Sequence, residues 1–380
     1  MFSQSKTDVL LDPYSGSGGV LVEGMLYDRR SIGIDLNPLA ILIARVKTRP
    51  IPPGPLMKVR SQLLTRIETL LKVSKQYPLP RIKNVSFWFK PKAIQGLSAI
   101  KEALNELSGD PEVHDFFRIC FSLTVRKSSN IKNGEFKLYG RQGDELKAFE
   151  PKPVESFAKV TLDNIARMRG FFEEMQNHPR GSATVLKGDT RELLEIDPSI
   201  LSERQVKIVI TSPPYGDSHT TVAYGQFSRY SSLWLGLPEE EVLSVDDRGL
   251  GGRILGEKQS LGSPTLERVL SEIGQTDEHR AKEVYSFFYD ADVCLDQIGK
   301  ALVRGQSHCC YVVANRTVRR VKVPADVIFT ELAENHGFKH LTTFYREIPN
   351  KYIPHVNAPE NIPGKLGATM TNESIVVWKY

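Results

Sequence analysis

The sequence predicts an α/β fold built on a mostly parallel sheet, and three observations lead to this prediction. A short apolar strand at Asp8–Leu11 runs into a glycine-rich turn and then a helix, as a nucleotide-binding βαβ unit does. A second apolar strand, Ile208–Thr211, ends in prolines, which cannot continue a ladder of hydrogen bonds. Residues 50–180 interrupt the βα alternation with a helical pattern, so we expect one sheet that carries a helical insertion.

Length and composition are those of a globular protein with one large domain or two. The chain has 380 residues, 40% hydrophobic and 25% charged, without an apolar run long enough to span a membrane and without a secretory signal. The net charge of +5 permits a polyanionic partner but does not require one. The irregular spacing of the cysteines argues against a metal site or a disulfide framework and fits a cytoplasmic protein: Cys120, Cys294, Cys309 and Cys310.

The glycine-rich turn predicts the type of ligand. It reads Asp12-Pro-Tyr-Ser-Gly-Ser-Gly-Gly19, so its glycines allow close approach of a ligand, but it lacks the G-x-G-x-x-G pattern of dinucleotide sites. The carboxylate of Asp12 would repel a pyrophosphate and attract a cation. Asp35 ends the second strand, Ser31–Ile34, about 20 residues further on, where it can bond a ribose diol. Together these features predict S-adenosylmethionine, which carries an ammonium and a sulfonium.

The stretch Thr211-Ser-Pro-Pro-Tyr215 predicts the chemistry. In open α/β sheets, ligands bind at the carboxyl ends of the strands, which is where this stretch lies. The Ser212 hydroxyl and a neighbouring main-chain carbonyl can accept the two hydrogens of one amino group, and Tyr215 offers a face for a planar ring. The set suits the exocyclic amine of a nucleobase. The alternative is a strand followed by a Pro-Pro turn with a surface tyrosine.

Four stretches of the chain resemble, in order, the motifs of amino-group DNA methyltransferases. They read DPYSGSGG, GIDLNPLA, GDTREL and TSPPYGDS, and the resemblance covers residues 8–48, 184–236 and, more loosely, 284–380. TSPPY resembles the form typical of N4-cytosine enzymes, whereas N6-adenine enzymes more often carry Asp or Asn where Ser212 stands. The resemblance implies a Rossmann-like S-adenosylmethionine-dependent methyltransferase sheet, double-stranded DNA as partner, and a restriction–modification system.

The resemblance also implies roles for individual residues. The catalytic set is Ser212, Pro213, Pro214 and Tyr215: hydrogen bonds to the amine favour a pyramidal nitrogen, and Tyr215 stacks on a base that has left the duplex. An acidic residue at Asp189 would face the adenine of the cofactor, although it could equally cap the turn. The expected cofactor-binding residues are Asp12, Tyr14, Gly16, Ser17, Gly18, Asp35, Leu36, Asn37, Asp189 and Thr211.

Residues 51–180 are expected to form the helical insertion, after a boundary marked by prolines between Pro50 and Pro55. Basic and aromatic residues lie along it, which favours contact with DNA phosphates, while the alternative is a structural lid with solvated charges. His219 is not assigned as a general base, because the chemistry needs none. The expected DNA contacts are Lys90, Arg126, Lys127, His219, Arg229, Arg346, Asn350 and Lys351. Helices are predicted at Leu56–Val73, Ala93–Leu107, Phe116–Val125 and Val154–Gln176.

The methyltransferase domain is expected to occupy residues 1–50 and 181–380. Residues 216–230 read as a loop over the catalytic edge, and residues 239–275, rich in Gly, Ser and charge, predict a mobile loop. Phe338–Ile348 and Ser374–Lys379 would form an antiparallel hairpin that closes the sheet. The other elements expected in this domain are a third strand at Thr184–Gly188, a helix at Val284–Leu302, a fifth strand at Cys309–Val313 and a helix from Pro324 to Asn335.

One departure from the family pattern concerns the start of the chain. Methyltransferases of this kind usually carry a helix before the first strand that covers the methionine end of the cofactor, but only seven residues precede this strand. We therefore expect that another segment supplies the cover, that a second subunit does, or that the start of the chain is truncated. The remaining alternatives are N6-adenine methylation, an RNA or tRNA amine methyltransferase, and a non-catalytic DNA- or cofactor-binding subunit of a methyltransferase complex.

Overall fold

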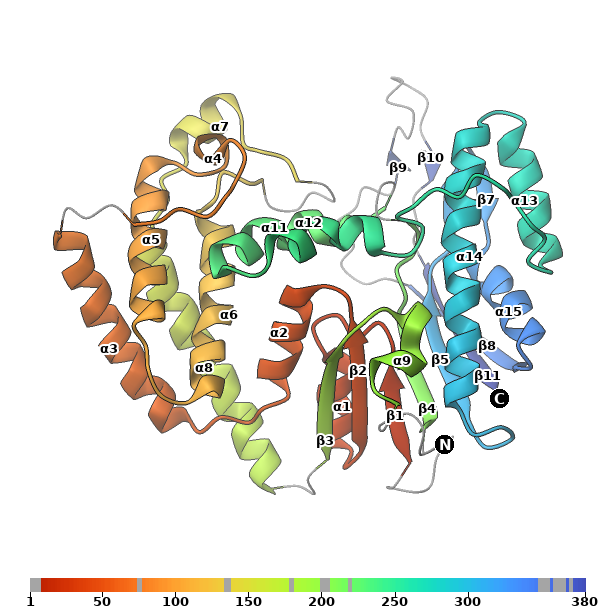
Figure 1. Ribbon diagram of the computed structural model, residues 1–380, viewed down its shortest axis with the longest axis horizontal. Coiled ribbons are helices and arrows are strands. Elements are labelled where there is room, and N and C mark those ends of the chain that lie inside the picture. The colour runs from red at the N-terminus through yellow and green to blue at the C-terminus, as the bar shows by residue number, and fades with distance from the viewer. Residues whose placement is uncertain are drawn as a thin grey trace.

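A computed structural model describes residues 8–73, 77–132, 138–177, 181–198, 206–217, 221–347, 356–357, 367–368 and 372–380. Within these residues seven strands form one sheet in the order β3-β2-β1-β4-β5-β11-β8 (Figure 1). Neighbours from β3 to β5 run parallel, and β11 runs antiparallel to both β5 and β8. The mostly parallel sheet and its antiparallel closing pair are therefore confirmed. The strands are β1 Val9–Asp12, β2 Arg30–Asp35, β3 Ser182–Lys187, β4 Val206–Thr211, β5 His308–Val313, β8 Lys339–Glu347 and β11 Asn372–Lys379.

The sheet forms where β-branched and apolar residues are buried between helices. Ile32, Ile34 and Val209 have no exposed surface, as expected for parallel strands covered on both faces. The largest core packs central strands against α13, α14 and α15, and a smaller cluster joins α1 and α2 to β3. These helices are α1 Gly19–Leu26, α2 Pro38–Lys47, α13 Pro264–Gly274, α14 Glu278–Ala301 and α15 Ala325–Asn335.

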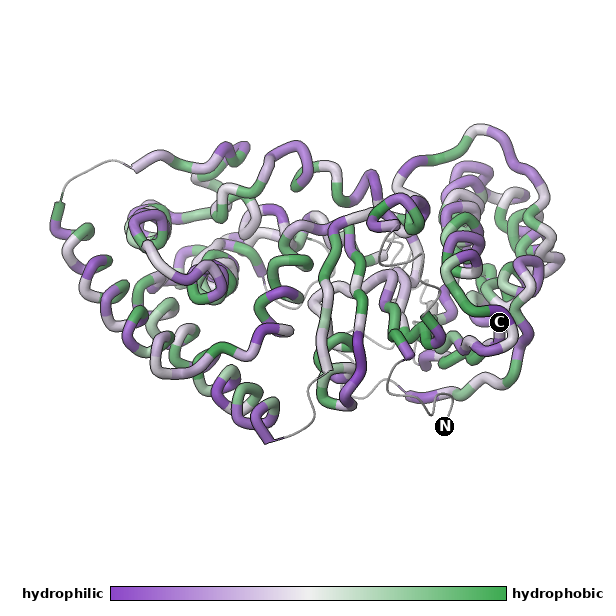
Figure 2. The backbone as a smooth tube through the Cα atoms, turned by 60° about the horizontal axis from the view of Figure 1, so that its bottom comes forward, coloured by the Kyte–Doolittle hydropathy of each residue, from purple (hydrophilic) through white to green (hydrophobic). Residues whose placement is uncertain are grey.

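The stretch between α2 and β3 folds into helices with a core of their own. This core buries Leu97, Phe117, Phe121 and Phe157, and it also includes Val46 of α2. Along them, hydrophobic and hydrophilic positions alternate, which is typical of amphipathic helices (Figure 2). We call this part, residues 51–177, the helical lobe. Its helices are α3 Pro53–Lys72, α4 Val85–Trp88, α5 Pro91–Asn105, α6 Pro111–Ser128, α7 Gly143–Ala148 and α8 Pro153–Asn177.

Two helices join the helical lobe to the sheet. Helices α11 (Tyr224–Leu235) and α12 (Glu239–Arg248) lie across the middle of Figure 1, above the strands of the sheet. Trp234 of α11 is fully buried in the core of the lobe, and the Ser231 hydroxyl donates to the carbonyl of Ser122. Because α11 follows the predicted catalytic stretch, this packing connects the lobe directly to the strand ends.

The prediction of a mobile loop at residues 239–275 is wrong. This segment contains α12 and α13, and α13 buries Leu266, Val269, Leu270 and Ile273. Ser263 caps α13 through a hydrogen bond from the Leu266 amide. The segment is rich in glycine and charged residues, and the prediction therefore overlooked the helical spacing of its apolar residues. The expected loop at residues 216–230 is also shorter than predicted, because α11 already begins at Tyr224.

The remaining elements are short. Two small antiparallel pairs lie outside the main sheet, and β3 leads into a single helical turn before α9. No helix in the described part of the chain is both long and apolar enough to cross a membrane. These short elements are η1 Thr190–Glu192, α9 Leu193–Ile196, β6 Arg316–Val318, β7 Val321–Val323, β9 Val356–Asn357 and β10 Gly367–Ala368.

Candidate active site

The carboxyl ends of four adjacent strands meet at one edge of the sheet. Strands β2, β1, β4 and β5 are neighbours in that order. Asp35 ends β2, Asp12 ends β1, and Thr211 ends β4, immediately before Ser212. The predicted cofactor turn and the predicted catalytic stretch, almost 200 residues apart in the chain, therefore lie side by side.

Asp12 is a buried carboxyl group at the centre of this edge. Only 3% of the residue is exposed, and the Thr211 hydroxyl donates to its Oδ1 at 2.6 Å. Burial raises the pKa of Asp12 to about 7, against the lowering effect of the Thr211 hydrogen bond, and the nearby charge of Asp35 raises it slightly further. A cationic ligand at this position would stabilise the ionised form.

Asp35 ties the glycine turn to the second strand. Its two carboxyl oxygens accept the amides of Gly16 and Asn37, each at 2.8 Å. Burial nevertheless raises the pKa of Asp35. Gly16 and Gly18 both adopt positive φ, and a Cβ on Gly18 would lie 2.9 Å from the Cβ of Ala44, so the turn can pack against α2 only with glycine there.

The other predicted cofactor residues differ in their surroundings. The ring of Tyr14 packs against the main core and its hydroxyl hydrogen-bonds with the Sγ of Cys294, so its hydroxyl points away from the strand ends into α14. Asn37 caps α2 by accepting the Leu39 amide and donates to the hydroxyl of Ser228 on α11. Ser17 is exposed and Leu36 is half-buried.

Asp189 takes the capping position that was the alternative to a cofactor contact. Its carboxylate accepts the amide of Arg191 at 3.0 Å and the Arg191 guanidinium at 2.6 and 3.0 Å. Arg191 also pairs with Asp290 of α14 at 2.9 Å and donates to the carbonyl of Arg248 at the end of α12. Arg191 was not expected from the sequence, and it joins three elements beside the candidate site.

The predicted catalytic stretch is held by contacts on both sides. Ser212 is exposed, and its hydroxyl donates to the Val312 carbonyl at 3.1 Å and lies 3.4 Å from the Tyr215 hydroxyl. The Tyr215 hydroxyl donates to Oε1 of Glu373 at 2.7 Å. Burial, together with the carboxylate of Glu373, raises the pKa of Tyr215 to about 12. Pro213 is buried and Pro214 is half-buried.

The residues after Tyr215 are fixed by a buried ion pair. Asp217, 1% exposed, pairs with Arg316 of β6 at 3.1 Å. A Cβ on Gly216 would lie 2.3 Å from Nη1 of Arg316, so glycine allows the loop to pass close to this guanidinium. Sequence reasoning missed Glu373 and Asp217, because nothing in their local sequence indicates which distant residues they meet.

The expected DNA contacts do not form one continuous group among the described residues. Lys90 donates to the carbonyls of Lys147 and Phe149, and Arg346 pairs with Glu373, so both already have protein partners. The remaining basic residues lie beside α11: Arg126 over the ring of Phe227, Lys127 exposed next to it, and Arg229 3.8 Å from Asp246. His219, Asn350 and Lys351 lie outside the described residues.

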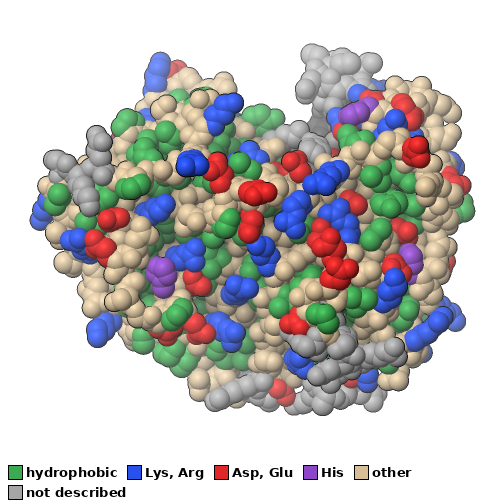
Figure 3. Space-filling model, viewed as in Figure 1, with side chains coloured by type: hydrophobic (Ala, Val, Ile, Leu, Met, Phe, Trp, Pro, Cys, Tyr) green, Lys and Arg blue, Asp and Glu red, His purple; other side chains and the backbone are tan. Residues whose placement is uncertain are grey.

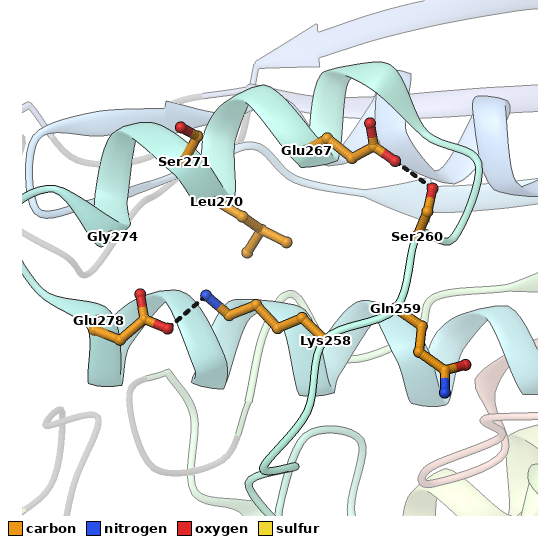
Figure 4. Close-up of a pocket in the computed structure, with 8 residues that line it drawn as sticks. All are labelled: Lys258, Gln259, Ser260, Glu267, Leu270, Ser271, Gly274 and Glu278. Carbon is orange, nitrogen blue, oxygen red and sulfur yellow. Dashed lines mark hydrogen bonds and ion pairs between the residues drawn. The ribbon is translucent and has the colours of Figure 1, made fainter.

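Other parts of the described surface do not compete as reaction sites. A hollow between α13 and α14 is lined by Lys258, Ser260, Glu267 and Glu278, which pair with each other in two contacts (Figure 4). No group of three His, Cys, Asp or Glu side chains placed to hold a metal occurs among the residues that the structure describes.

The fold and this edge define a class of protein. A Rossmann-like sheet closed by an antiparallel strand between β5 and β8, with acidic residues at the ends of β1 and β2, is the fold of S-adenosylmethionine-dependent methyltransferases. Comparison with known proteins agrees. The chain is 37% identical over 385 residues to Type II methyltransferase M.MvaI of Kocuria varians, covering 97% of this chain and 84% of that protein. The chain therefore belongs to the Type II methyltransferases.

Other comparisons add less. Type II methyltransferase M.MjaII of Methanocaldococcus jannaschii is 37% identical over 65 residues, which cover 17% of this chain and 12% of that protein. Among solved structures, the rRNA methyltransferase aviRa of Streptomyces viridochromogenes aligns with 98% of this chain and 76% of its own at 12% identity. Its TM-score of 0.31 carries no argument about this chain. No family model matches the sequence.

Proposed function

We propose that this protein methylates the exocyclic N4 amino group of cytosine in double-stranded DNA, at a specific sequence and as part of a restriction–modification system. Membership of the Type II methyltransferases supports the restriction–modification setting. The observation that carries the choice of an amino group is the position of the Ser212 hydroxyl, exposed at the end of β4 beside the buried carboxyl group of Asp12.

The hydrogen bonds of Ser212 determine what it can do. A hydroxyl has one proton to donate and two lone pairs. The Ser212 proton points to the Val312 carbonyl, with the Tyr215 hydroxyl as a second acceptor nearby. Its oxygen therefore keeps lone pairs for an incoming N–H, which suits an amino group rather than a carbonyl oxygen.

The residues at the strand ends fit S-adenosylmethionine, which supplies an electrophilic methyl group when bound. Asp12 would hold its cationic methionine part, since a buried carboxyl group with a pKa near 7 ionises readily beside a positive charge. Asp35 and the glycine turn would hold the ribose. Asp189 is already paired with Arg191. The adenine would therefore contact this ion pair rather than an unpaired carboxylate.

The proposed chemistry needs orientation more than proton abstraction. Ser212 and a main-chain carbonyl near Pro213 accept the N–H groups of the target amine, which weakens the delocalisation of its lone pair into the ring. Holding the nitrogen in line with the methyl group would then supply most of the rate enhancement. The N–C bond would form as the S–C bond of the donor breaks, with the thioether as leaving group, and one amine proton would pass to solvent. The target base leaves the duplex to reach this edge, and Tyr215 provides the face on which it stacks.

The charge distribution supports DNA as the substrate. Residues 51–180 contain 22 lysines and arginines against 14 aspartates and glutamates, a net +8, while the rest of the chain has 28 against 31, a net −3. The last turn of α6, with Arg126 and Lys127, contacts α11, which follows the catalytic stretch. Figure 3 shows Lys and Arg side chains spread over the helical lobe, on the left of the view. A positive lobe of this kind would attract phosphates.

One experiment tests the proposal. The purified chain is incubated with tritiated S-adenosylmethionine and mixed genomic DNA, and the nucleosides are analysed by mass spectrometry. N4-methylcytosine is expected. N6-methyladenine would contradict the assignment of the target base from Ser212, and methylation of RNA alone would contradict the assignment of DNA. A second subunit stays a prediction: transfer by the chain alone would show that none is required.

The alternative of a non-catalytic subunit needs its own control. Ser212→Ala is expected to bind S-adenosylmethionine as well as the native protein does, but to lose methyl transfer by about 100-fold, since it removes an acceptor that touches the reacting amine. Equal activity of the Ser212→Ala variant would contradict the proposed role of this residue.

A further inference from the structure

A series of polar contacts connects the catalytic stretch to the paired strands β11 and β8. Ser212 lies 3.4 Å from the Tyr215 hydroxyl, and this hydroxyl donates to Oε1 of Glu373 at 2.7 Å. The other oxygen of Glu373 accepts from Nε and Nη2 of Arg346 at 2.8 and 2.7 Å. Glu373 and Arg346 face each other across the β11–β8 pair. The contacts therefore connect two segments about 160 residues apart in the chain.

We infer that Glu373 is a positioning residue for methyl transfer, which holds the Tyr215 hydroxyl and thereby orients the ring and the neighbouring Ser212 toward the target base. This inference rests on the proposed function of the Ser212–Tyr215 stretch. Glu373 itself does not touch the reacting atoms in this arrangement; it acts through Tyr215.

Burial and backbone placement show why Glu373 is suited to this task. Its side chain is 13% exposed, whereas that of Arg346 is 58% exposed. Glu373 pairs with Arg346 of β8, and the next residue, Ser374, pairs with both β8 and β5, so the carboxylate is presented by a strand backbone. Tyr215, in contrast, follows two prolines in a loop without strand pairing. The strand can therefore define the position of the tyrosine hydroxyl, while the loop by itself cannot.

Arg346 fixes the other side of this anchor. Its guanidinium donates to Oε2 of Glu373, while Oε1 accepts from the Tyr215 hydroxyl. A hydrogen bond from a neutral hydroxyl to an ionised carboxylate is stronger than one to a neutral acceptor. The pair thus gives Tyr215 a strong, directional partner at one side of the catalytic edge.

The alternative is that Glu373 and Arg346 form only a cross-strand ion pair that stabilises the sheet edge. The two possibilities differ in their dependence on the Tyr215 hydroxyl. If Glu373 acts through that hydroxyl, removing the carboxylate has no further effect once the hydroxyl is gone. If Glu373 only stabilises the strand, removing its carboxylate changes kcat by the same factor with and without the Tyr215 hydroxyl.

The test is a double-mutant cycle with Tyr215→Phe, Glu373→Ala and the double variant, measured with unmodified DNA and S-adenosylmethionine. Glu373→Ala and Tyr215→Phe are each expected to lower kcat about tenfold, with the KM for S-adenosylmethionine within about twofold of the native value. The double variant is expected to equal Tyr215→Phe. Glu373→Gln keeps an oxygen that accepts the hydroxyl and should recover kcat to within about threefold of the native protein.

Glu347→Ala serves as the matched control, because it removes an exposed carboxylate from the neighbouring strand end, opposite Asn372, without touching Tyr215. Independent losses in the double variant would overturn the inference, as would a native kcat for Tyr215→Phe. Thermal unfolding and cofactor binding of every variant distinguish a loss of kcat from misfolding. If Glu373→Ala unfolds, the kcat values of Glu373→Gln and Tyr215→Phe still test whether Glu373 acts through the tyrosine hydroxyl. Undiminished activity of Ser212→Ala would instead contradict the proposed function on which the inference rests.

Discussion

Single side chains at the strand ends carry unusual protonation states. Asp12 has a pKa near 7 and Asp35 a raised pKa, because both carboxyl groups are buried beside each other with only partial compensation from hydrogen bonds. The pKa of Tyr215 is raised for a related reason, since burial and a carboxylate both oppose the ionisation of its hydroxyl. Perturbed groups of this kind cluster at functional sites, and here they border the edge where the cofactor and the target base would meet.

The pKa of Asp12 predicts how cofactor binding depends on pH. A cation favours the ionised carboxylate, which the free protein populates only as the pH rises through about 7. The affinity for S-adenosylmethionine should therefore increase about tenfold between pH 5.5 and 7.0 and then level off. Isothermal titration calorimetry in two buffers of different ionisation heat should show net proton release at pH 6.

The matched variant for this prediction is Asp12→Asn, whose amide oxygen can still accept the Thr211 hydroxyl. Its affinity should be lower at pH 7.5 and nearly independent of pH over the same range. A native protein whose affinity is equally flat, without proton release, would show that Asp12 does not sense the cationic part of the cofactor.

The burial of Asp12 also predicts how the variant changes stability. The folded-state pKa is raised from 3.8 to about 7, so the contribution of the native carboxyl group to stability is full below pH 3.8 and falls as the pH rises toward 7. Asp12→Asn should therefore raise the free energy of unfolding, with a gain about 2 kcal/mol larger at pH 8 than at pH 5. Chemical denaturation at the two pH values measures this difference, and an equal gain at both would contradict it.

At the scale of elements, a few ion pairs connect segments that are far apart in the chain. Arg191 joins the turn after β3 to α14 and to the end of α12, and Arg316 joins β6 to the catalytic loop. Both cations are largely buried and face carboxylates. Such pairs contribute little when intact compared with apolar packing, but their disruption leaves charges unpaired.

Arg191→Leu should for this reason be strongly destabilising. Asp189 and Asp290 would lose their common cation, so we expect the free energy of unfolding to fall by about 3 kcal/mol. Chemical denaturation followed by circular dichroism measures the change. Arg268→Leu, an exposed position on α13, should change stability by less than about 0.5 kcal/mol. Similar values for the two variants would indicate that the Arg191 network is not structural.

At the scale of the whole molecule, the helical lobe and the sheet divide two tasks. The sheet brings the cofactor turn and the catalytic stretch together, while the lobe carries the excess of positive charge. Helix α11 contacts both, because it follows the predicted catalytic stretch, buries Trp234 in the lobe and bonds Ser228 to Asn37, the N-cap of α2. One helix therefore connects the lobe to the end of β2.

The division of charge predicts a measurable salt effect. Lys127→Ala should weaken binding of a DNA duplex several-fold at low salt, equally for all sequences, and reduce the slope of log K against log salt by about 1. Lys300→Ala, an exposed lysine on α14, is the control and should leave the slope unchanged. Equal slopes for the two variants would contradict a phosphate contact at Lys127.

Comparison of prediction and structure shows where local sequence is sufficient. The strands, the long helices and the ends of the parallel strands were predictable because hydrophobic period, prolines and glycines act within a few residues. Residues 239–275 were misjudged, since the burial of Leu266 and Ile273 depends on surfaces supplied by β7, α14 and α15, not on local composition. Asp189 remained open between two roles, and Arg191, two residues away, determines its contacts.

The sequence by itself determined the fold class, the acidic glycine turn, the Ser-Pro-Pro-Tyr stretch and their order along the chain, because each of these is written in consecutive residues. Only the tertiary structure decided which groups meet. It placed the Thr211 hydroxyl on Asp12, Glu373 on Tyr215 and Arg316 on Asp217. The physical reason is that hydrogen bonds and ion pairs depend on distances of a few ångströms between segments up to about 200 residues apart, and the sheet order and helix packing set those distances.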